Sequence, residues 1–475
     1  MKKNFRDLIL NLIIAVLTLT MLVLMLMYAA QRAAGHQNDT EVFEKLWIVQ
    51  DYDGTAFTVF DSSLCTPELI AYKQSGMPAG VIHSDEELMS TLYSVLSDVI
   101  LDVFGSESMC ISENIDYETA VSMLTIADSY LMLEYSADIP FPYIYALTSG
   151  ESSVDTQMCA SGKAVYISKL ALLLSEDENK NIIYSALAFD SDHGAYSFER
   201  TDSKPYTLPS SDVVHLDAYS SSFEKAEFYS DKHGASAPST ELIYSSASYS
   251  PLQASSGMEF LGLDNDLTRA AFLELFELNP EKLNSFVERD GTTVFIGTDE
   301  RLTVSPDNTV EFSSPAEPIP LNKILGYTPS KKSSYSLFDM LKATDMLISR
   351  FRTAYPEHIG KSASIKLTGV YKDEASGGNP VFEYSYFYDG MRIDAPSAFR
   401  FVFTADGICK LTLNTTGFTV MSEKRVTLSK ETALERLSLK LSGEIKVRPI
   451  YILSDERIYS LEWAAYNFED KDQAR

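Results

Sequence analysis

The chain has 475 residues, of which 45% are hydrophobic, and a formal net charge of −28 at pH 7. At about 100 to 200 residues per domain, this length allows two to four domains with cores of their own. The first 35 residues carry four basic residues and one acidic residue, so the remainder has a net charge of −31. That excess of negative charge argues against binding to nucleic acid or to anionic lipid headgroups.

An uncharged and mainly apolar run extends from Leu8 to Ala30. Its roughly 23 residues, at about 1.5 Å each, are long enough to cross a bilayer as one helix. Basic residues precede the run and acidic residues soon follow it, which predicts a cytoplasmic N-terminus at residues 1–7 and an extracellular remainder. We therefore predict a single-pass protein of the cell membrane with its transmembrane helix at residues 8–30.

A cleaved secretory signal is the competing interpretation, because alanines at positions 29, 30, 33 and 34 offer small residues for cleavage. The apolar region of a signal peptide is usually about 7 to 15 residues long, so the length of this run favours a retained anchor. Under both interpretations the bulk of the chain is exported.

One face of the predicted membrane helix carries Asn11, Ala15, Thr18 and Leu22. Small or polar side chains on such a face permit close helix packing or a hydrogen bond between helices within lipid. We predict that this face contacts a helix of another membrane protein. The alternative is an anchor without a specific contact.

The cysteines and histidines show no spacing typical of a metal site. Four cysteines are spread through the chain without a Cys-x-x-Cys pair, and the six histidines are dispersed. Two disulfides in any of three connectivities, or free thiols, are compatible with this count. We predict no metal ligands, no cofactor and no catalytic residues.

The first exported domain is predicted at residues 41–260. A capping box at Ser84 and Glu87 begins a helix that ends at Gly105. Alternating and apolar runs predict strands further along this domain. They are Trp47–Val49, Ala56–Phe60, Tyr130–Glu134, Tyr143–Leu147, Ala164–Leu174, Ile182–Phe189 and Ala195–Phe198. Their order suggests an antiparallel meander with helices on one face, followed by long loops around a few strands between Thr201 and Met258.

A connecting α+β segment is predicted at residues 261–330. It begins with a helix from Leu267 to Leu278, which Asn279-Pro280 ends. Three short strands follow, at Thr292–Ile296, Arg301–Val304 and Thr309–Phe312.

Two helix-plus-meander modules are predicted at residues 331–420 and 421–475, the second being shorter. Each begins with a helix, one from Ser336 to Tyr355 and one that includes Ala433 and Leu434. The last two strands are predicted at Val447–Leu453 and Ile458–Tyr466. The fold class is therefore α+β, with a single transmembrane helix followed by several extracytoplasmic domains of antiparallel sheets packed with helices.

Two hairpins of the first module are specific enough to predict register. A two-residue loop at Asp389-Gly390 sets Tyr388 opposite Met391 and Tyr386 opposite Ile393. A three-residue loop at residues 405–407, with Gly407 as its left-handed residue, keeps the apolar side chains of the next hairpin on one face. Its predicted pairs are Phe403 with Cys409, Phe401 with Leu411, and Phe399 with Leu413.

A tyrosine stripe at positions 384, 386 and 388 has two interpretations. It is either an exposed binding platform or a strand face packed under the helix. The strand preference of tyrosine favours the packed face.

A series of local motifs follows in order along the chain: Leu275-Phe276, Asn279-Pro280, Asp290-Gly291, Arg301–Val304 and the stretch from Glu311 to Pro315. This order resembles the YycH family of extracytoplasmic regulators. The segment Phe382–Phe418 is similar to the repeated α+β module of YycH and its partner YycI. The resemblance implies a membrane-anchored modulator of a WalK-type sensor histidine kinase, which governs cell-wall metabolism, with contact as its activity.

We thus predict a non-enzymatic regulatory protein of a two-component signal transduction system. Its partners would be the sensor histidine kinase and a YycI-like sister regulator. The alternative is a cell-wall-binding or peptide-binding module, or a protease inhibitor, at the outer membrane-proximal surface. A hydrolase has no supporting residue set in the sequence.

Overall fold

The computed structural model describes residues 67–83, 88–89, 92–93, 109–140, 144, 166–178, 182–190, 194–200, 206–208, 223–228, 241–244, 248–257, 261, 263, 265–326, 335, 337–355, 362–373, 378–438 and 445–467. All of them belong to the unit Phe60–Arg475. The predicted anchor Leu8–Ala30 and the strands predicted before residue 61 lie outside the described residues. In the described part of the chain, no helix combines the length and apolarity that crossing a bilayer requires.

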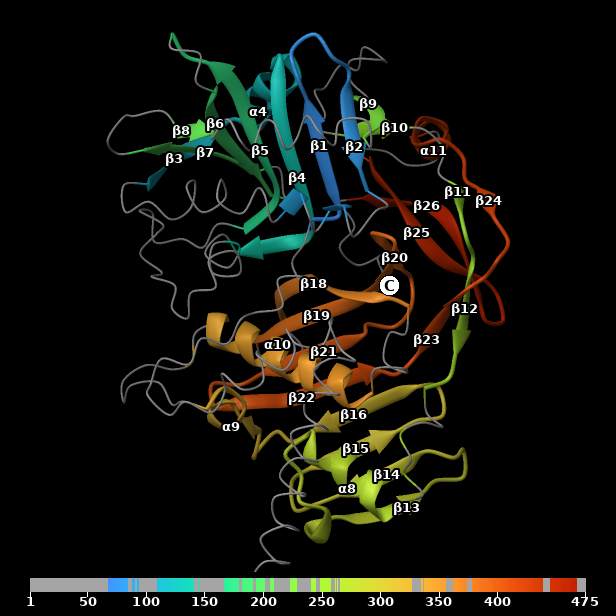
Figure 1. Cartoon of the computed structure of the whole chain (residues 1–475). Coiled ribbons are helices and arrows are strands. Elements are labelled where there is room, and N and C mark those ends of the chain that lie inside the picture. Colours follow the sequence, from blue (N-terminus) through green and yellow to red (C-terminus); the bar gives the residue numbers. More distant parts are fainter. Residues whose placement is uncertain are drawn as a thin grey trace, which may run out of the picture. The chain divides into compact units, whose positions relative to one another are not determined.

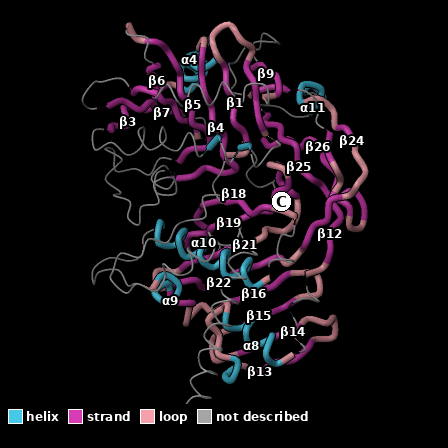
Figure 2. The backbone as a smooth tube through the Cα atoms, viewed as in Figure 1, coloured by secondary structure: helices cyan, strands magenta, loops and turns pink. Residues whose placement is uncertain are grey.

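The described chain is mixed α+β and consists mainly of antiparallel strands with few helices, as the sequence predicted (Figure 2). The helical elements are α4 (Tyr117–Ile126), α8 (Asp266–Glu274), the 3-10 helix η6 (Pro280–Lys282), α9 (Leu321–Leu325), α10 (Leu337–Ala354) and α11 (Lys430–Ser438).

The strands of the N-terminal half form one ten-stranded sheet, in the order β10-β9-β2-β1-β4-β5-β6-β7-β3, with β8 paired to β6 (Figure 1). Its strands are β1 (Leu69–Lys73), β2 (Ala79–Ile82), β3 (Met109–Ile115), β4 (Ser129–Pro140), β5 (Tyr166–Glu176), β6 (Ile182–Phe189), β7 (Ala195–Arg200), β8 (Tyr206–Leu208), β9 (Glu224–Phe228) and β10 (Leu242–Tyr244). Every pair in this sheet is antiparallel, and β4 to β7 form the predicted meander.

A fourteen-stranded sheet follows, in the order β13-β14-β15-β16-β22-β21-β19-β20-β25-β26-β12-β23, with β17 on β22 and β18 on β19. Its strands are β12 (Leu252–Ser255), β13 (Asn284–Val287), β14 (Thr293–Ile296), β15 (Arg301–Val304), β16 (Thr309–Ser313), β17 (Ile319–Pro320), β18 (Ser364–Asp373), β19 (Asn379–Tyr388), β20 (Met391–Ile393), β21 (Phe399–Phe403), β22 (Gly407–Asn414), β23 (Gly417–Val420), β25 (Ile445–Asp455) and β26 (Ile458–Asn467). Strand β11 (Ser248–Tyr249) pairs separately with β24 (Arg425–Val426). Only β20 and β25 run parallel among the described pairs of this sheet.

Helix α10 packs on one face of the larger sheet (Figure 1), and aromatic side chains fill the layer between them. The Phe351 ring lies 5.7 Å from the Phe399 ring of β21. Tyr384 and Tyr386 of β19 are fully buried on this sheet, and the Tyr384 hydroxyl lies 2.5 Å from the Thr344 hydroxyl of α10. The packed-face interpretation of the tyrosine stripe is therefore confirmed at these two positions.

The Asp389-Gly390 hairpin has the predicted two-residue loop. Both loop residues have positive φ, as a type I′ turn requires, and Tyr388 pairs with Met391. In the second hairpin, Phe399–Leu413 and Phe401–Leu411 are confirmed.

The predicted pair of Phe403 with Cys409 is wrong. A bulge between Val402 and Phe403 leaves Phe403 opposite Ile408. Gly407 is not left-handed either. It is required because β17 crosses it closely: a Cβ at position 407 would lie 2.1 Å from the Ile319 carbonyl oxygen.

Two predicted elements also change in extent or type. The helix predicted to Leu278 ends at Glu274, because Glu277 adopts a left-handed conformation and the Leu278 N–H bonds back to the Leu273 carbonyl at 3.1 Å. In the predicted strand Tyr143–Leu147, the one described residue, Ile144, is helical. Leu88, Met89, Leu92 and Tyr93 are helical as predicted, whereas Ser84, Glu87 and Gly105 lie outside the described residues.

Candidate functional site

Six charged side chains meet where the last strands and α11 contact the ten-stranded sheet, and we call them the ion-pair cluster. They are Glu68, Glu134, Lys169, Glu241, Lys430 and Arg448. Three are acidic and three are basic, so the cluster is neutral as a set. Their side chains are between 4% and 18% exposed, which makes this a largely dry site.

Local strand geometry brings the first two members together. Glu134 of β4 and Lys169 of β5 are directly opposite each other in the ladder. Alternation then places them on the face that carries Tyr130 and Met132 of β4 and Ala171 of β5, which belong to the hydrophobic core that this sheet shares with α4. The Lys169 Nζ lies 3.3 Å from the Glu134 Oε1.

The remaining members come from segments distant in sequence. Glu241, just before β10, accepts from Lys169 at 3.5 Å and from Lys430 of α11 at 2.8 Å. Arg448 of β25 contacts Glu134 through Nη2 and lies 3.3 Å from the Glu68 carboxylate through Nη1. The cluster therefore connects the ten-stranded sheet to α11 and to β25.

Burial and pairing act against each other on the basic groups. Burial lowers the pKa of Arg448, but the carboxylates of Glu134 and Glu68 outweigh it, and the pKa is raised above its ordinary value. The same balance, with Glu134 and Glu241, raises the pKa of Lys169. At Lys430 burial is the stronger effect and the pKa is lowered. Removing Arg448 would leave Glu68 buried without its cationic partner in the cluster, and removing Glu241 would do the same to Lys430.

An aromatic pair borders the cluster. The His83 ring stacks on the Tyr244 ring with centroids 4.4 Å apart, and Lys430 Nζ lies 5.2 Å from the Tyr244 centroid. His83 Nε2 lies 3.2 Å from the Glu224 carboxylate, whereas its Nδ1 is buried without a hydrogen-bond partner among the described residues. Burial raises the pKa of Tyr244, so the phenol is neutral at physiological pH.

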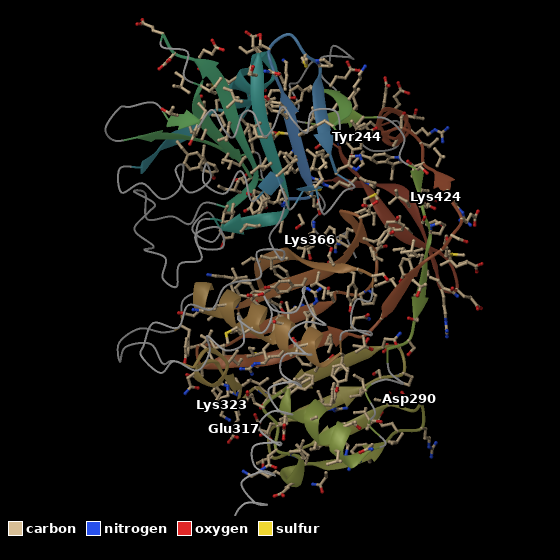
Figure 3. All side chains as sticks on the ribbon, in the orientation of Figure 1. Tyr244, Asp290, Glu317, Lys323, Lys366 and Lys424 are labelled. Atoms are coloured by element: carbon tan, nitrogen blue, oxygen red, sulfur yellow. The ribbon has the colours of Figure 1, made fainter. Side chains whose placement is uncertain are left out.

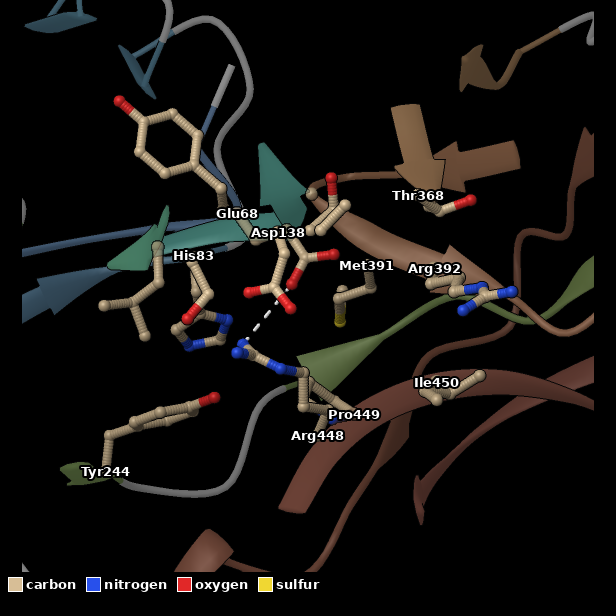
Figure 4. A pocket seen from close by; sticks show the side chains of 16 residues that line it. Glu68, His83, Asp138, Tyr244, Thr368, Met391, Arg392, Arg448, Pro449 and Ile450 are labelled. Atoms are coloured by element: carbon tan, nitrogen blue, oxygen red, sulfur yellow. Dashed lines mark ion pairs between the residues drawn. The ribbon is translucent and has the colours of Figure 1, made fainter. Parts of the chain in front are cut away.

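A cavity of about 270 Å³ opens beside these groups, between the ten-stranded sheet and strands β18, β20 and β25 (Figure 4). Its charged lining consists of Glu68, Asp138, Arg392 and Arg448, and its aromatic lining includes His83 and Tyr244. The Glu68–Arg448 ion pair lies within this lining. The volume is close to the lower end of the range for small-molecule sites, about 300 Å³. Groups of both charge signs suit a small polar ligand that carries both charges.

Within the described ranges, no three His, Cys, Asp or Glu side chains gather in a way that could hold a metal ion. Cys409 is a free thiol, half-buried at the hairpin bulge, with its Sγ 3.4 Å from the Val402 carbonyl oxygen. Burial raises the pKa of this thiol, which leaves it protonated and a poor nucleophile at neutral pH.

The predicted membrane contact face, Asn11, Ala15, Thr18 and Leu22, lies outside the described residues. The sequence reasoning missed the ion-pair cluster altogether. One signal was available: Glu134 and Lys169 are single charges within otherwise apolar strand runs, and a charge buried in a strand is rarely found without a partner.

Comparison of the chain with protein-family models, with curated proteins and with solved structures finds no match.

Proposed function

We propose that this chain is a membrane-anchored extracytoplasmic regulator that acts by contact with other membrane proteins. Its partner in this proposal is a two-component sensor histidine kinase that controls cell-wall metabolism, joined by a YycI-like sister regulator. The support from the sequence is the apolar run Leu8–Ala30, the acidic remainder and the resemblance to the YycH family. We also propose that residues 331–420 and 421–475 form the two tandem modules of this regulator.

The structural observation that carries the proposal is the ion-pair cluster. It joins Glu134 and Lys169 of one sheet to Lys430 and Arg448 of the C-terminal elements. In this proposal the contact alternates between the paired arrangement of the structure and a separated, hydrated one, because buried ion pairs contribute little net stability relative to their desolvation cost. A partner that binds one arrangement more tightly shifts the balance, and the partner's own equilibrium shifts by the same coupling energy.

The experiment that tests the membrane contact uses cysteines placed in the apolar run. Ala15→Cys and Thr18→Cys are expected to form adducts with cysteines introduced in the kinase span. Ile13→Cys is the matched control, because position 13 lies on the opposite face of a helix from Asn11 and Ala15. Deletion of the chain is expected to change kinase output. Absence of adducts together with unchanged output would rule the proposal out.

The cavity favours a second candidate function, recognition of a cell-wall peptide. A short peptide end or an amino acid carries both an ammonium and a carboxylate, which match Asp138 and Arg392 in the lining. Purified muropeptides are then expected to raise the melting temperature of the chain. Arg392→Ala is expected to remove that shift, whereas Arg457→Ala, at an exposed position, is expected to retain it.

A further inference from the structure

Strand β13 is the terminal strand of the fourteen-stranded sheet, and no described strand pairs with its outer edge. All four of its residues are exposed, with Phe286 at 48% and Val287 at 67%. The exposure continues through the turn to Asp290, which Figure 3 labels beside β13 and β14. Open edges with exposed apolar side chains are templates for pairing with another strand.

The backbone of β13 shows which groups are free to pair. The Glu288 N–H donates to the Thr292 carbonyl at 2.7 Å, so the even-numbered residues of β13 direct their backbone groups toward β14. By alternation, the N–H and C=O groups of Ser285 and Val287 and the C=O group of Leu283 point away from the sheet, whereas the Leu283 N–H donates to the Pro280 carbonyl at 3.4 Å. These are the groups that a partner strand would bond.

The side chains around β13 are complementary to themselves in an antiparallel arrangement. If Ser285 lies opposite its own copy, Leu283 of one chain lies opposite Val287 of the other, which places two apolar side chains together. Both are on the face that also carries Phe295, because Ser285 is paired with Phe295 across the ladder.

The charges that flank the strand fit the same register. Lys282 comes opposite Glu288, and Glu281 comes opposite Arg289, and symmetry repeats both matches. All four side chains are exposed. A register centred on Phe286 would place the apolar Leu283 opposite the charged Arg289. A register shifted by one residue would place backbone groups that point outward on one chain opposite groups that point inward on the other, so the hydrogen bonds could not form.

We propose that β13 is a homodimerisation edge, at which two copies of this chain join their fourteen-stranded sheets through an antiparallel β13–β13 pair centred on Ser285. One short strand pair buries less surface than a stable complex, for which about 1,200 to 2,000 Å² is typical. The dimer is therefore weak and reversible, and it forms independently of the ion-pair cluster and of the cavity.

A disulfide trap tests the register in the full chain. Ser285→Cys brings two thiols together in a hydrogen-bonded pair about 5.5 Å apart at Cα, within the range for a disulfide. Phe286→Cys is the matched control, because its two copies are diagonal neighbours about 7 to 8 Å apart. The unsubstituted chain reports any crosslinks formed by the native cysteines.

The expected result is a covalent dimer with Ser285→Cys and far less with Phe286→Cys. Equal yields from the two variants, or no dimer from either, would overturn the proposal. Melting curves of the reduced variants establish that both are folded.

A charge exchange tests the pairing without a crosslink. Glu288→Lys sets two lysines opposite each other twice per dimer and is expected to weaken dimerisation about tenfold in equilibrium ultracentrifugation. Adding Lys282→Glu to the same chain is expected to restore the wild-type constant. Failure of the double variant to restore dimerisation would contradict the register.

Discussion

Lys430 and Glu241 are 189 positions apart in the chain, yet the Lys430 Nζ lies 2.8 Å from the Glu241 carboxylate with side-chain exposures of 4% and 9%. The pair fixes the first turn of α11 against the residue that precedes β10. Glu241 also pairs with Lys169, but Lys430 has no second carboxylate in the cluster, so loss of Glu241 would leave the Lys430 charge buried without compensation. This relationship makes the stability of the C-terminal elements depend on residues in the N-terminal half.

Arg448→Met is expected to destabilise the chain by about 3 to 5 kcal/mol, because a neutral side chain leaves Glu68 without its cationic partner in the cluster and Glu134 with Lys169 as its remaining one. Urea unfolding followed by the fluorescence of Trp463, in a Trp47→Phe background, measures the change near the cluster. Arg457→Met is the control at an exposed position, with an expected effect within about 0.5 kcal/mol. A cost at position 448 no larger than that of the control would show that the cluster contributes no stability.

The hydrogen bond between Thr344 and Tyr384 is expected to stabilise the packing of α10 on β19. Thr344→Val removes the threonine hydroxyl that bonds the Tyr384 phenol. Because both side chains are buried, water cannot replace this bond, and the expected cost is about 1 to 3 kcal/mol. The double variant with Tyr384→Phe should cost less than the sum of the two single changes. Tyr371→Phe provides the comparison, since this 42% exposed phenol bonds Glu383 at the surface and water can replace it.

Gly407→Ala is expected to cost about 1 to 3 kcal/mol because the new methyl group would lie 2.1 Å from a backbone oxygen of β17, which must move away. Gly378→Ala is the control for backbone strain, because an alanine there meets no steric overlap. Its φ is +81° and no atom lies within 4 Å of an added Cβ, so only the conformational penalty of about 1 kcal/mol applies. Thermal unfolding of both variants checks the order, and an equal loss in the two would refute the steric account.

Asp299 is expected to contribute stability that disappears in acid. Its carboxylate accepts hydrogen bonds from the backbone N–H groups of Glu317 and Ala316, at 2.9 and 2.7 Å, and these bonds hold its pKa below the ordinary value. Because the folded-state pKa is the lower one, the contribution is complete above the unfolded pKa of about 4 and is lost as the pH falls through the folded pKa.

The measurement for Asp299 compares the melting temperatures of the wild-type chain and Asp299→Asn across pH 7 to 3. The asparagine variant should melt lower at pH 7, and the two curves should converge toward the acid end. Asp307→Asn is a control with a carboxylate that accepts a single backbone bond, from Thr309. A difference between wild type and Asp299→Asn that is independent of pH would contradict the assignment.

Local sequence pattern was sufficient for β4 to β7, β14 to β16, β19 to β22, β25 and β26. It missed β1 to β3, β8 to β13, β17, β18, β23 and β24, most of which are short. The strand Ile182–Phe189 was predicted at its observed bounds, and the pairs Phe399–Leu413 and Phe401–Leu411 followed from keeping apolar side chains on one face. A shift of one residue would have exposed the whole apolar set, so the pattern alone excludes it. The same logic placed Tyr384 and Tyr386 under α10.

What the sequence by itself determined is thus the α+β class, the type of the strongly patterned elements and most of the register within the two hairpins, because these depend on neighbours a few positions apart. Only the tertiary structure decided that Phe403 pairs with Ile408, that Gly407 serves the approach of β17, and that Glu134, Lys169, Glu241, Lys430 and Arg448 meet in one place. Those features depend on the order of strands in the sheets and on partners far along the chain. The local sequence around a charged strand residue does not indicate which distant charge will pair with it.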